Sequence, residues 1–475
     1  MIIPFDLGSG NKNYNARTSR ANIINGYIEF SNDGKFKRIR RANGLKPFLT
    51  IGGGPIRGLF AIRGELFVAS GPELYRVEND LTVSLLGNIG GIDKPVQINA
   101  IGTDNIQIMT VSNGLGWLWD SLGGFRQIVD GVFLADFPDI SVASLNQIFW
   151  VNAPNSNLFG GSETGDGEVW PASRFASGEQ NPDDVVWVLA KQTGLWILGT
   201  RTIEPWQTNP SDPLLPIRPI AGGTIQRGVA APYSVAQWQD SFFWLADDLT
   251  VWMLTGSTPK KISDLSLEYA IRGDGITEPY IQPQAAQGFF IDHAVQKLYV
   301  LTFPSDGETW VYDVVTTQWH KRETKNIGRW RGRESALAFD KVIIGDYANG
   351  NIYEWSESTF TENGDKISLE IVTPPMRATD ADLFINEVST IMEVGVAGVG
   401  EPAPKMQIKY SRDGGQTYKS KKDVEFGIQG DYQRKVIRRQ FGRTKRGFDF
   451  VLKLTITDPV PVYIYEMFAD ASKGI

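Results

Sequence analysis

The densest group of side chains that could do chemistry is cationic and lies near the C-terminal end of the sequence. Seven Lys and Arg residues fall within 13 positions: Arg434, Lys435, Arg438, Arg439, Arg443, Lys445 and Arg446. Such a cluster can bind DNA phosphate or a protein partner through its charge. It can equally be a solvated strand edge whose charges prevent pairing with another chain. Few aromatic residues are interspersed, so the pattern does not indicate stacking on exposed bases.

A motif just before this cluster, from Ser411 to Tyr418, reads S-x-D-x-G-x-T followed by an aromatic residue. It resembles the Asp-box of sialidases and related propellers. The Asp side chain of such a turn accepts local backbone N–H groups, and Gly supplies a positive φ. We therefore predict a structural hairpin turn far from any catalytic centre.

A second basic group lies near the N-terminus and consists of Lys35, Lys37, Arg38, Arg40 and Arg41. It falls in a predicted hairpin whose strands are Gly26 to Phe30 and Phe36 to Arg40, joined by a turn at Asn32, Asp33 and Gly34. Because charges on a hairpin usually face water, we predict a solvated face here.

The remaining residues do not form an enzymatic pattern. The chain has no Cys and two His, His293 and His320, which argues against a thiol nucleophile, a metal site or a histidine relay. We predict that His320 is a residue of a blade rim and not a ligand. The Gly-rich segments Gly52–Gly54 and Gly222–Gly223 lack the Lys-Ser/Thr that a phosphate loop needs. The Arg residues near strands do not recur at one repeat position: Arg63, Arg76, Arg201, Arg227 and Arg329. We expect no catalytic residues, no cofactor and no metal.

The elements that position these residues form a repeat. A short apolar strand is followed 8 to 12 residues later by a second strand that carries an aromatic residue, with turn residues between them. The first strands of seven such pairs start at Leu66, Ile106, Ile148, Leu195, Phe242, Leu298 and Val342. Their spacings of 40, 42, 47, 47, 56 and 44 residues match the length of a four-stranded propeller blade. We predict an all-β fold with a β-propeller of about seven blades, six or eight being possible; several independent β-sandwiches are the alternative.

The ends of the chain differ from the repeat. Residues 51–360 hold the predicted propeller. Residues 1–50 form an N-terminal segment and hairpin, one strand of which could close the propeller. Longer alternating strands in residues 361–475 predict a separate β-sandwich. Helix signals are sparse, with one short helix or turn expected over Ile262 to Ile271.

Composition excludes other classes. The formal charge of −7 argues against a general nucleic-acid coat. The N-terminal residues lack the apolar region of a signal peptide, and no apolar run approaches the ~20 residues that span a bilayer. We therefore expect a soluble protein without membrane insertion.

Scattered short segments along nearly the whole chain resemble the packaged-DNA stabilisation, or tail hub, proteins of short-tailed bacteriophages. They are Ile23 to Glu29, Gly44 to Phe48, Gly53 to Leu59, Arg201 to Trp206, Gly222 to Gly228 and Arg439 to Arg443 before Phe448 to Pro459. The resemblance implies a virion protein of the tail, assembled in the bacterial cytoplasm as a ring, typically a hexamer. It also implies contacts with portal-adaptor proteins, tail fibres or spikes, and needle or nozzle proteins.

The same resemblance implies that double-stranded DNA passes through the ring without specific binding, and that no catalytic residue belongs to the role. An acidic channel wall would let DNA slide, because like charge repels phosphate. Two other functions stay open on the sequence: a glycan-binding or sialidase-like propeller, and a cellular interaction scaffold.

Overall fold

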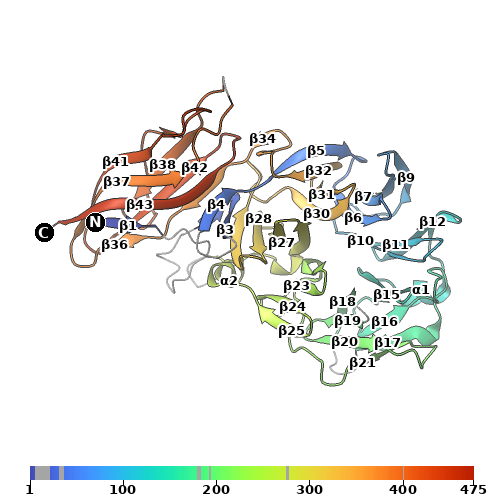
Figure 1. Ribbon diagram of the computed structural model, residues 1–475. Helices are drawn as coiled ribbons and strands as arrows, with labels where there is room; N and C mark the ends of the chain where they lie inside the picture. The colour runs from blue at the N-terminus through green and yellow to red at the C-terminus, as the bar shows by residue number, and fades with distance from the viewer. Residues whose placement is uncertain are drawn as a thin grey trace.

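The computed structural model shows a ring of small sheets with a β-sandwich attached at one side (Figure 1). It describes residues 1–5, 22–30, 37–178, 183–191, 194–273, 278–398 and 401–474. The predicted turn at Asn32, Asp33 and Gly34, together with Lys35 and Phe36, lies outside the described residues.

Seven antiparallel sheets form the ring, and each contributes four strands to one blade. Blades one to three consist of β6 (Ile56–Ile62), β7 (Glu65–Ser70), β8 (Glu73–Val77) and β9 (Val83–Asn88); β10 (Gln97–Ile101), β11 (Gln107–Ser112), β12 (Leu115–Asp120) and β13 (Gly124–Gln127); and β14 (Val142–Leu145), β15 (Ile148–Asn152), β16 (Leu158–Gly161) and β17 (Phe175–Ser177). Blades four and five consist of β18 (Val185–Lys191), β19 (Gly194–Gly199), β20 (Ile203–Thr208) and β21 (Ile217–Pro219); and β22 (Ala236–Trp238), β23 (Ser241–Leu245), β24 (Val251–Thr255) and β25 (Thr258–Lys261). Blades six and seven consist of β26 (Gln287–His293), β27 (Gln296–Phe303), β28 (Glu308–Asp313) and β29 (Gln318–Arg322); and β30 (Gly332–Ala338), β31 (Lys341–Asp346), β32 (Asn351–Ser356) and β5 (Gly44–Thr50).

The predicted strand pairs are the second and third strands of these blades, so the prediction of a seven-bladed propeller is confirmed. Second strands such as β15 and β23 are buried along their whole length, because neighbouring blades cover both of their faces. Tight turns such as Asn113-Gly114, with φ values of 54° and 73°, join them to the third strands.

The ring closes with a strand that the sequence did not single out. β5 pairs antiparallel with β32 and completes the seventh blade. The hairpin that we considered for this role, β3 (Gly26–Phe30) and β4 (Lys37–Arg41), instead joins the sandwich by pairing with β43 (Tyr463–Gly474).

The sandwich packs two sheets around one apolar core. One sheet runs β3-β4-β43-β37-β41, with β1 (Ile2–Pro4) beside β43, β37 at Asp382–Met392 and β41 at Val436–Thr444. The other contains β2 (Asn22–Ile24), β35 (Leu369–Val372), β36 (Met376–Arg377), β38 (Lys405–Ser411), β39 (Lys419–Ser420), β40 (Val424–Glu425) and β42 (Asp449–Ile456). The longer strands predicted in residues 361–475 are present as β35, β37, β38, β41, β42 and β43.

Short strands lie between the two domains, and one of them, β2, pairs with both. β2 pairs with β29 of the sixth blade on one side and with β35 of the sandwich on the other. β33 (Thr361–Glu362), followed by β34 (Asp365–Lys366), pairs with the closing strand β5. Because backbone hydrogen bonds run from blade to sandwich, we expect the two domains to move as one body.

Helices are few. α2 (Leu265–Arg272) confirms the short helix expected near Ile262, and the Asp264 side chain caps it by accepting the N–H of Leu267. α1 (Gly131–Asp136) was not predicted, and single 3-10 turns lie at Ala172–Arg174, Pro232–Ser234 and Pro283–Ala285. None of the helices in the described ranges is long and apolar enough to cross a membrane.

Candidate functional site

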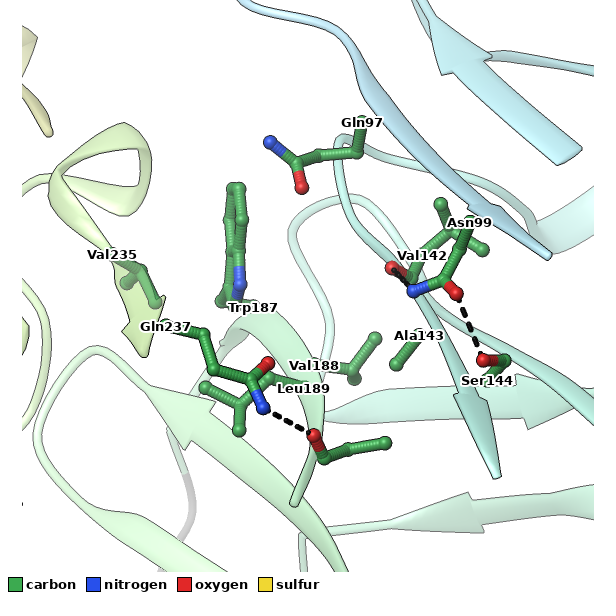
Figure 2. Close-up of a pocket in the computed structure, with 11 residues that line it drawn as sticks. Gln97, Asn99, Val142, Ala143, Ser144, Trp187, Val188, Leu189, Val235 and Gln237 are labelled. Atoms are coloured by element: carbon green, nitrogen blue, oxygen red, sulfur yellow. Dashed lines mark hydrogen bonds between the residues drawn. The ribbon is translucent and has the colours of Figure 1, made fainter. Parts of the chain in front are cut away.

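The axis of the propeller contains a cavity with two lobes, of about 310 and 190 Å³. The innermost strands of the blades supply its walls, and Gln97, Val235 and Gln237 belong to both lobes. Figure 2 shows the larger lobe, where amide side chains and the ring of Trp187 surround the space. The size of this lobe is that of a small ligand pocket.

Two amides in this lobe, those of Asn99 and Gln237, connect neighbouring blades (Figure 2). Asn99 of the second blade donates to the carbonyl of Val142 in the third, 3.4 Å away, and accepts from Ser144 Oγ at 2.8 Å. Gln237 of the fifth blade donates to the carbonyl of Ala190 in the fourth at 2.9 Å. We therefore interpret them as contacts that hold the ring closed.

One carboxylate, Glu334 of β30, is among the residues that line the two lobes. Burial raises the pKa of Glu334 to about 8, and the neighbouring Arg333 offsets this only in part. A sialidase-type site needs several Arg side chains that converge on the carboxylate of the sugar. No Arg is among the residues that line the two lobes, so their geometry does not support the sialidase-like alternative.

Replacing Glu334 by Gln is expected to stabilise the protein at pH 8 but not at pH 4. A Glu carboxyl has a pKa near 4.3 when unfolded. The folded state therefore holds the proton more tightly, and stability falls as pH rises from about 4 to 8. Since the side chain is partly exposed to the cavity, we expect a gain of about 1–2 kcal/mol at pH 8. Urea denaturation of both proteins at the two pH values measures it; equal gains at both would contradict the assignment.

The cationic cluster of the sequence lies on and beside β41, the edge strand of one sandwich sheet. Three of its members are in ion pairs: Arg434 with Glu425 and Asp431, Arg439 with Glu387, and Arg443 with Asp382. Arg438 donates to the backbone carbonyls of Lys422 and Asp423. The exposed side chains of Lys435, Lys445 and Arg446 have no ion-pair partner in the described part of the chain.

The cluster both protects a strand edge and leaves cations for a partner, which are the two interpretations that the sequence allowed. The carbonyls of Gln440 and Phe441 on β41 accept from Lys421 Nζ and Arg412, so side chains cover this stretch of the strand edge. The cations at the two ends of β41 stay available to a partner. The first 360 residues carry 30 Lys and Arg against 38 Asp and Glu, whereas residues 361–475 carry 17 against 16. The exposed cations Lys435, Lys445 and Arg446 therefore belong to a chain whose propeller is acidic.

The Asp-box is the predicted structural turn. Asp413 Oδ1 accepts the N–H groups of Gln416 and Thr417 at 3.0 and 2.9 Å, and Gly414 and Gly415 have φ values of 75° and 88°. Although burial acts in the opposite direction, hydrogen bonds from Ser411, Thr417 and Gln416 lower the pKa of Asp413 to about 2. The turn lies at the end of β38 in the sandwich, outside the axial cavity.

The prediction of a solvated face for the N-terminal basic group is wrong at two positions. Arg41 is fully buried, and its two terminal nitrogens donate to the carbonyls of Ile367, Ile456, Asp458 and Val460 in the sandwich. Arg40 is 7% exposed and pairs with Glu29 at 3.0 Å and Glu357 at 3.2 Å. These carbonyl and carboxylate partners satisfy the charges that burial would otherwise leave unpaired. Lys37 is exposed and the Arg38 side chain is 41% exposed, as the pattern predicted.

A buried ion pair that the sequence did not reveal lies where propeller and sandwich meet. Arg322 of β29 contacts Glu362 of β33 at 3.0 Å, and both side chains are at most 3% exposed. Glu362 also accepts from Thr324 Oγ1 at 2.6 Å and Trp330 Nε1 at 2.8 Å. The Arg322 guanidinium lies 4.8 and 4.9 Å from the ring centroids of Trp330 and Trp355. Arg322 and Glu362 are 40 positions apart in the sequence and belong to different sheets, so no repeat or motif spacing predicts that they pair.

The remaining singled-out residues do not converge. His320 lies on β29, the outermost strand of the sixth blade, as predicted, and burial lowers its pKa to about 3. Of the Arg residues near strands, Arg63 and Arg76 belong to the first blade, whereas Arg201, Arg227 and Arg329 lie in or beside other blades. The described ranges contain no group of three or more His, Asp or Glu residues that could hold a metal ion.

Comparisons with known proteins agree with this architecture. The family model described as "Bacteriophage P22 Gp10, beta-propeller" matches residues 35–360, and the one described as "Bacteriophage P22 Gp10, beta-sandwich" matches residues 368–472. No curated protein sequence matches. Among solved structures, a streptogramin B lyase is similar with 9% identity and a TM-score of 0.44, over 66% of this chain and 98% of that one. BamB from Moraxella catarrhalis has 11% identity and a TM-score of 0.38, over 75% and 96% of the two chains. The two family models together cover nearly the whole chain, which therefore belongs to the bacteriophage P22 Gp10 family of phage DNA-stabilisation and tail hub proteins.

Proposed function

We propose that six copies of this chain form a ring in the tail of a short-tailed phage, below the portal and its adaptor. The ring extends the DNA channel, anchors fibres or spikes and needle or nozzle proteins, and helps to retain the packaged genome. Family membership supports the tail location. The observation that carries the mechanical role is the pairing of β2 with both β29 of the propeller and β35 of the sandwich, from which we infer that the two domains move as one unit.

The charge distribution supports a channel through which DNA passes without being held by specific contacts. The propeller, residues 44–360, has a formal charge of −13, from 22 Lys and Arg against 35 Asp and Glu. Like charge repels the phosphate backbone, so an acidic wall does not retain DNA by itself. Retention in this proposal comes from the closed ring and its appendages.

The test is a nonsense mutation in the gene for this chain, complemented from a plasmid. We expect heads that fill with DNA but lose it after purification, tails without appendages, and no plaques until the plasmid is supplied. Stable DNA-filled heads with complete tails in the absence of the protein would contradict the proposal. A direct companion measurement is binding of the purified chain to double-stranded DNA at physiological salt, where we expect none.

A further inference from the structure

The outer edges of the blades are protected to different degrees. The outermost strands of blades six and seven are covered, since β29 pairs with β2 and β5 pairs with β33. β25 carries Pro259, Lys260 and Lys261, β21 carries Arg218 and Pro219, β13 carries Arg126, and β17 has three residues. Proline, lysine, arginine and short length are the usual devices that prevent an exposed edge from pairing.

The outer edge of the first blade has none of these devices. β9 has six residues, with no Lys, Arg or Pro, and within the described ranges it pairs with β8 alone. Every second residue from the preceding turn into β9 is an exposed aliphatic side chain. Leu81 in the turn is 38% exposed, and Val83 and Leu85 on the strand are 40% and 56% exposed. The register with β8 shifts at Leu86, but no proline or cation of β9 interrupts the exposed aliphatic row. Such a row on a sheet edge is typical of a protein interface.

Acidic residues flank this apolar row. Residues 65–88 contain four carboxylates, those of Glu65, Glu73, Glu78 and Asp80, against one cation. That cation, Arg76, is bound to Glu65 and lies 3.1 Å from Glu78. A partner of this surface, which we name the blade-one rim, should therefore offer apolar groups together with positive charge.

The sandwich of the same chain offers that combination. Tyr432 and Phe448 stand at the two ends of β41 and are 65% and 53% exposed. Between and beside them lie the unpaired cations Lys435, Lys445 and Arg446. We name this surface the β41 edge. Aromatic and Arg side chains are the residues that contribute most to protein interfaces.

The two surfaces lie at opposite sides of the molecule, with β41 in the sandwich and β9 at the far side of the ring (Figure 1). A contact between two unlike surfaces leaves one of each free at the ends of the assembly, so copies add head to tail. They form a ring when the rotation from one copy to the next closes. We infer that the β41 edge of one copy docks on the blade-one rim of the next. This inference rests on the ring that we propose above and names the surfaces that build it.

Two charge-changing variants of the full chain test the contact. The rim variant is Val83→Lys with Leu85→Lys, and the edge variant is Lys435→Glu with Lys445→Glu and Arg446→Glu. The matched control is Lys405→Glu with Lys409→Glu, on exposed positions of the other sandwich sheet. Sedimentation velocity over a range of concentrations measures self-association, and circular dichroism with thermal melting verifies that each variant is folded.

We expect each test variant alone to self-associate at least about 100-fold more weakly than the wild type, because several interface residues are altered at once. An equimolar mixture of the two should recover dimers, since the intact edge of the rim variant meets the intact rim of the edge variant. The control should associate like the wild type. Wild-type association that persists in both variants overturns this contact and leaves the ring standing. A wild-type chain that stays monomeric at every concentration overturns the contact and the self-assembling ring together.

Discussion

Replacing Glu362 by Gln is expected to destabilise the protein by about 3–5 kcal/mol. The change leaves Arg322 charged, buried and without its carboxylate, between Trp330 and Trp355. Thr324 Oγ1 and Trp330 Nε1 donate to the same carboxylate, so their bonds weaken too. The free energy of unfolding from urea titration, followed by tryptophan fluorescence, measures the loss.

The matched control for this substitution is Glu387→Gln, which removes the partner of Arg439 at 2.6 Å. The Arg439 side chain is 72% exposed, so solvent and salt screen the pair. We expect a loss below about 1 kcal/mol. Similar losses of unfolding free energy in the Glu362→Gln and Glu387→Gln variants would contradict the prediction that burial makes the Arg322–Glu362 pair important for stability.

Replacing Arg41 by Met is expected to cost about 3–5 kcal/mol and to loosen the hairpin from the sandwich. Arg41 donates to four backbone carbonyls, among them Ile456 O at 2.8 Å and Val460 O at 2.9 Å. Burial lowers its pKa to about 10, so it remains protonated at neutral pH. Methionine fills much of the space but leaves these buried carbonyls without a donor.

Arg38, on the same strand, provides the comparison. Its guanidinium pairs with Glu29 at 2.7 Å, but its side chain is 41% exposed. Arg38→Met should therefore change the free energy of unfolding by less than about 1 kcal/mol. Hydrogen exchange of the β3–β4 hairpin should become faster in the Arg41 variant and stay unchanged in the Arg38 variant. Unchanged exchange in both would contradict the anchoring role of Arg41.

The repeat was readable from the sequence because each blade must bury its second strand on both faces. Segments such as Phe242-Phe243-Trp244 are continuous apolar runs for that reason, and their spacing predicted about seven blades. The sandwich strands were readable from alternation, as in β38, where exposed Lys405, Gln407 and Lys409 separate buried residues.

The contacts between the domains could not be predicted from the sequence, because they join residues that are far apart along the chain. Gly44–Thr50 has Lys and Pro within it, and only its pairing with β32 makes it the last strand of the ring. Arg40 and Arg41 look like surface cations in sequence, yet the carbonyls that bind Arg41 lie more than 300 residues away. Sequence periodicity describes neighbours along the chain and contains no information on such partners.

The candidate site shows the same division. The position and charge of the cationic cluster came directly from the sequence, and so did the Asp-box turn. Which cations remain available depends on carboxylates supplied by other strands, such as Glu387 and Asp382 of β37. The apolar rim of the first blade was missed because Leu81, Val83 and Leu85 read as ordinary strand residues until the sheet edge is known.

Cryo-electron microscopy of the phage that encodes this chain tests the central claim most directly. We expect a ring of six copies beneath the portal and adaptor, in which each copy fits as one seven-bladed disc fused rigidly to its sandwich. A tail that lacks this chain at that level, or copies whose disc and sandwich adopt variable relative positions within the ring, would contradict the account.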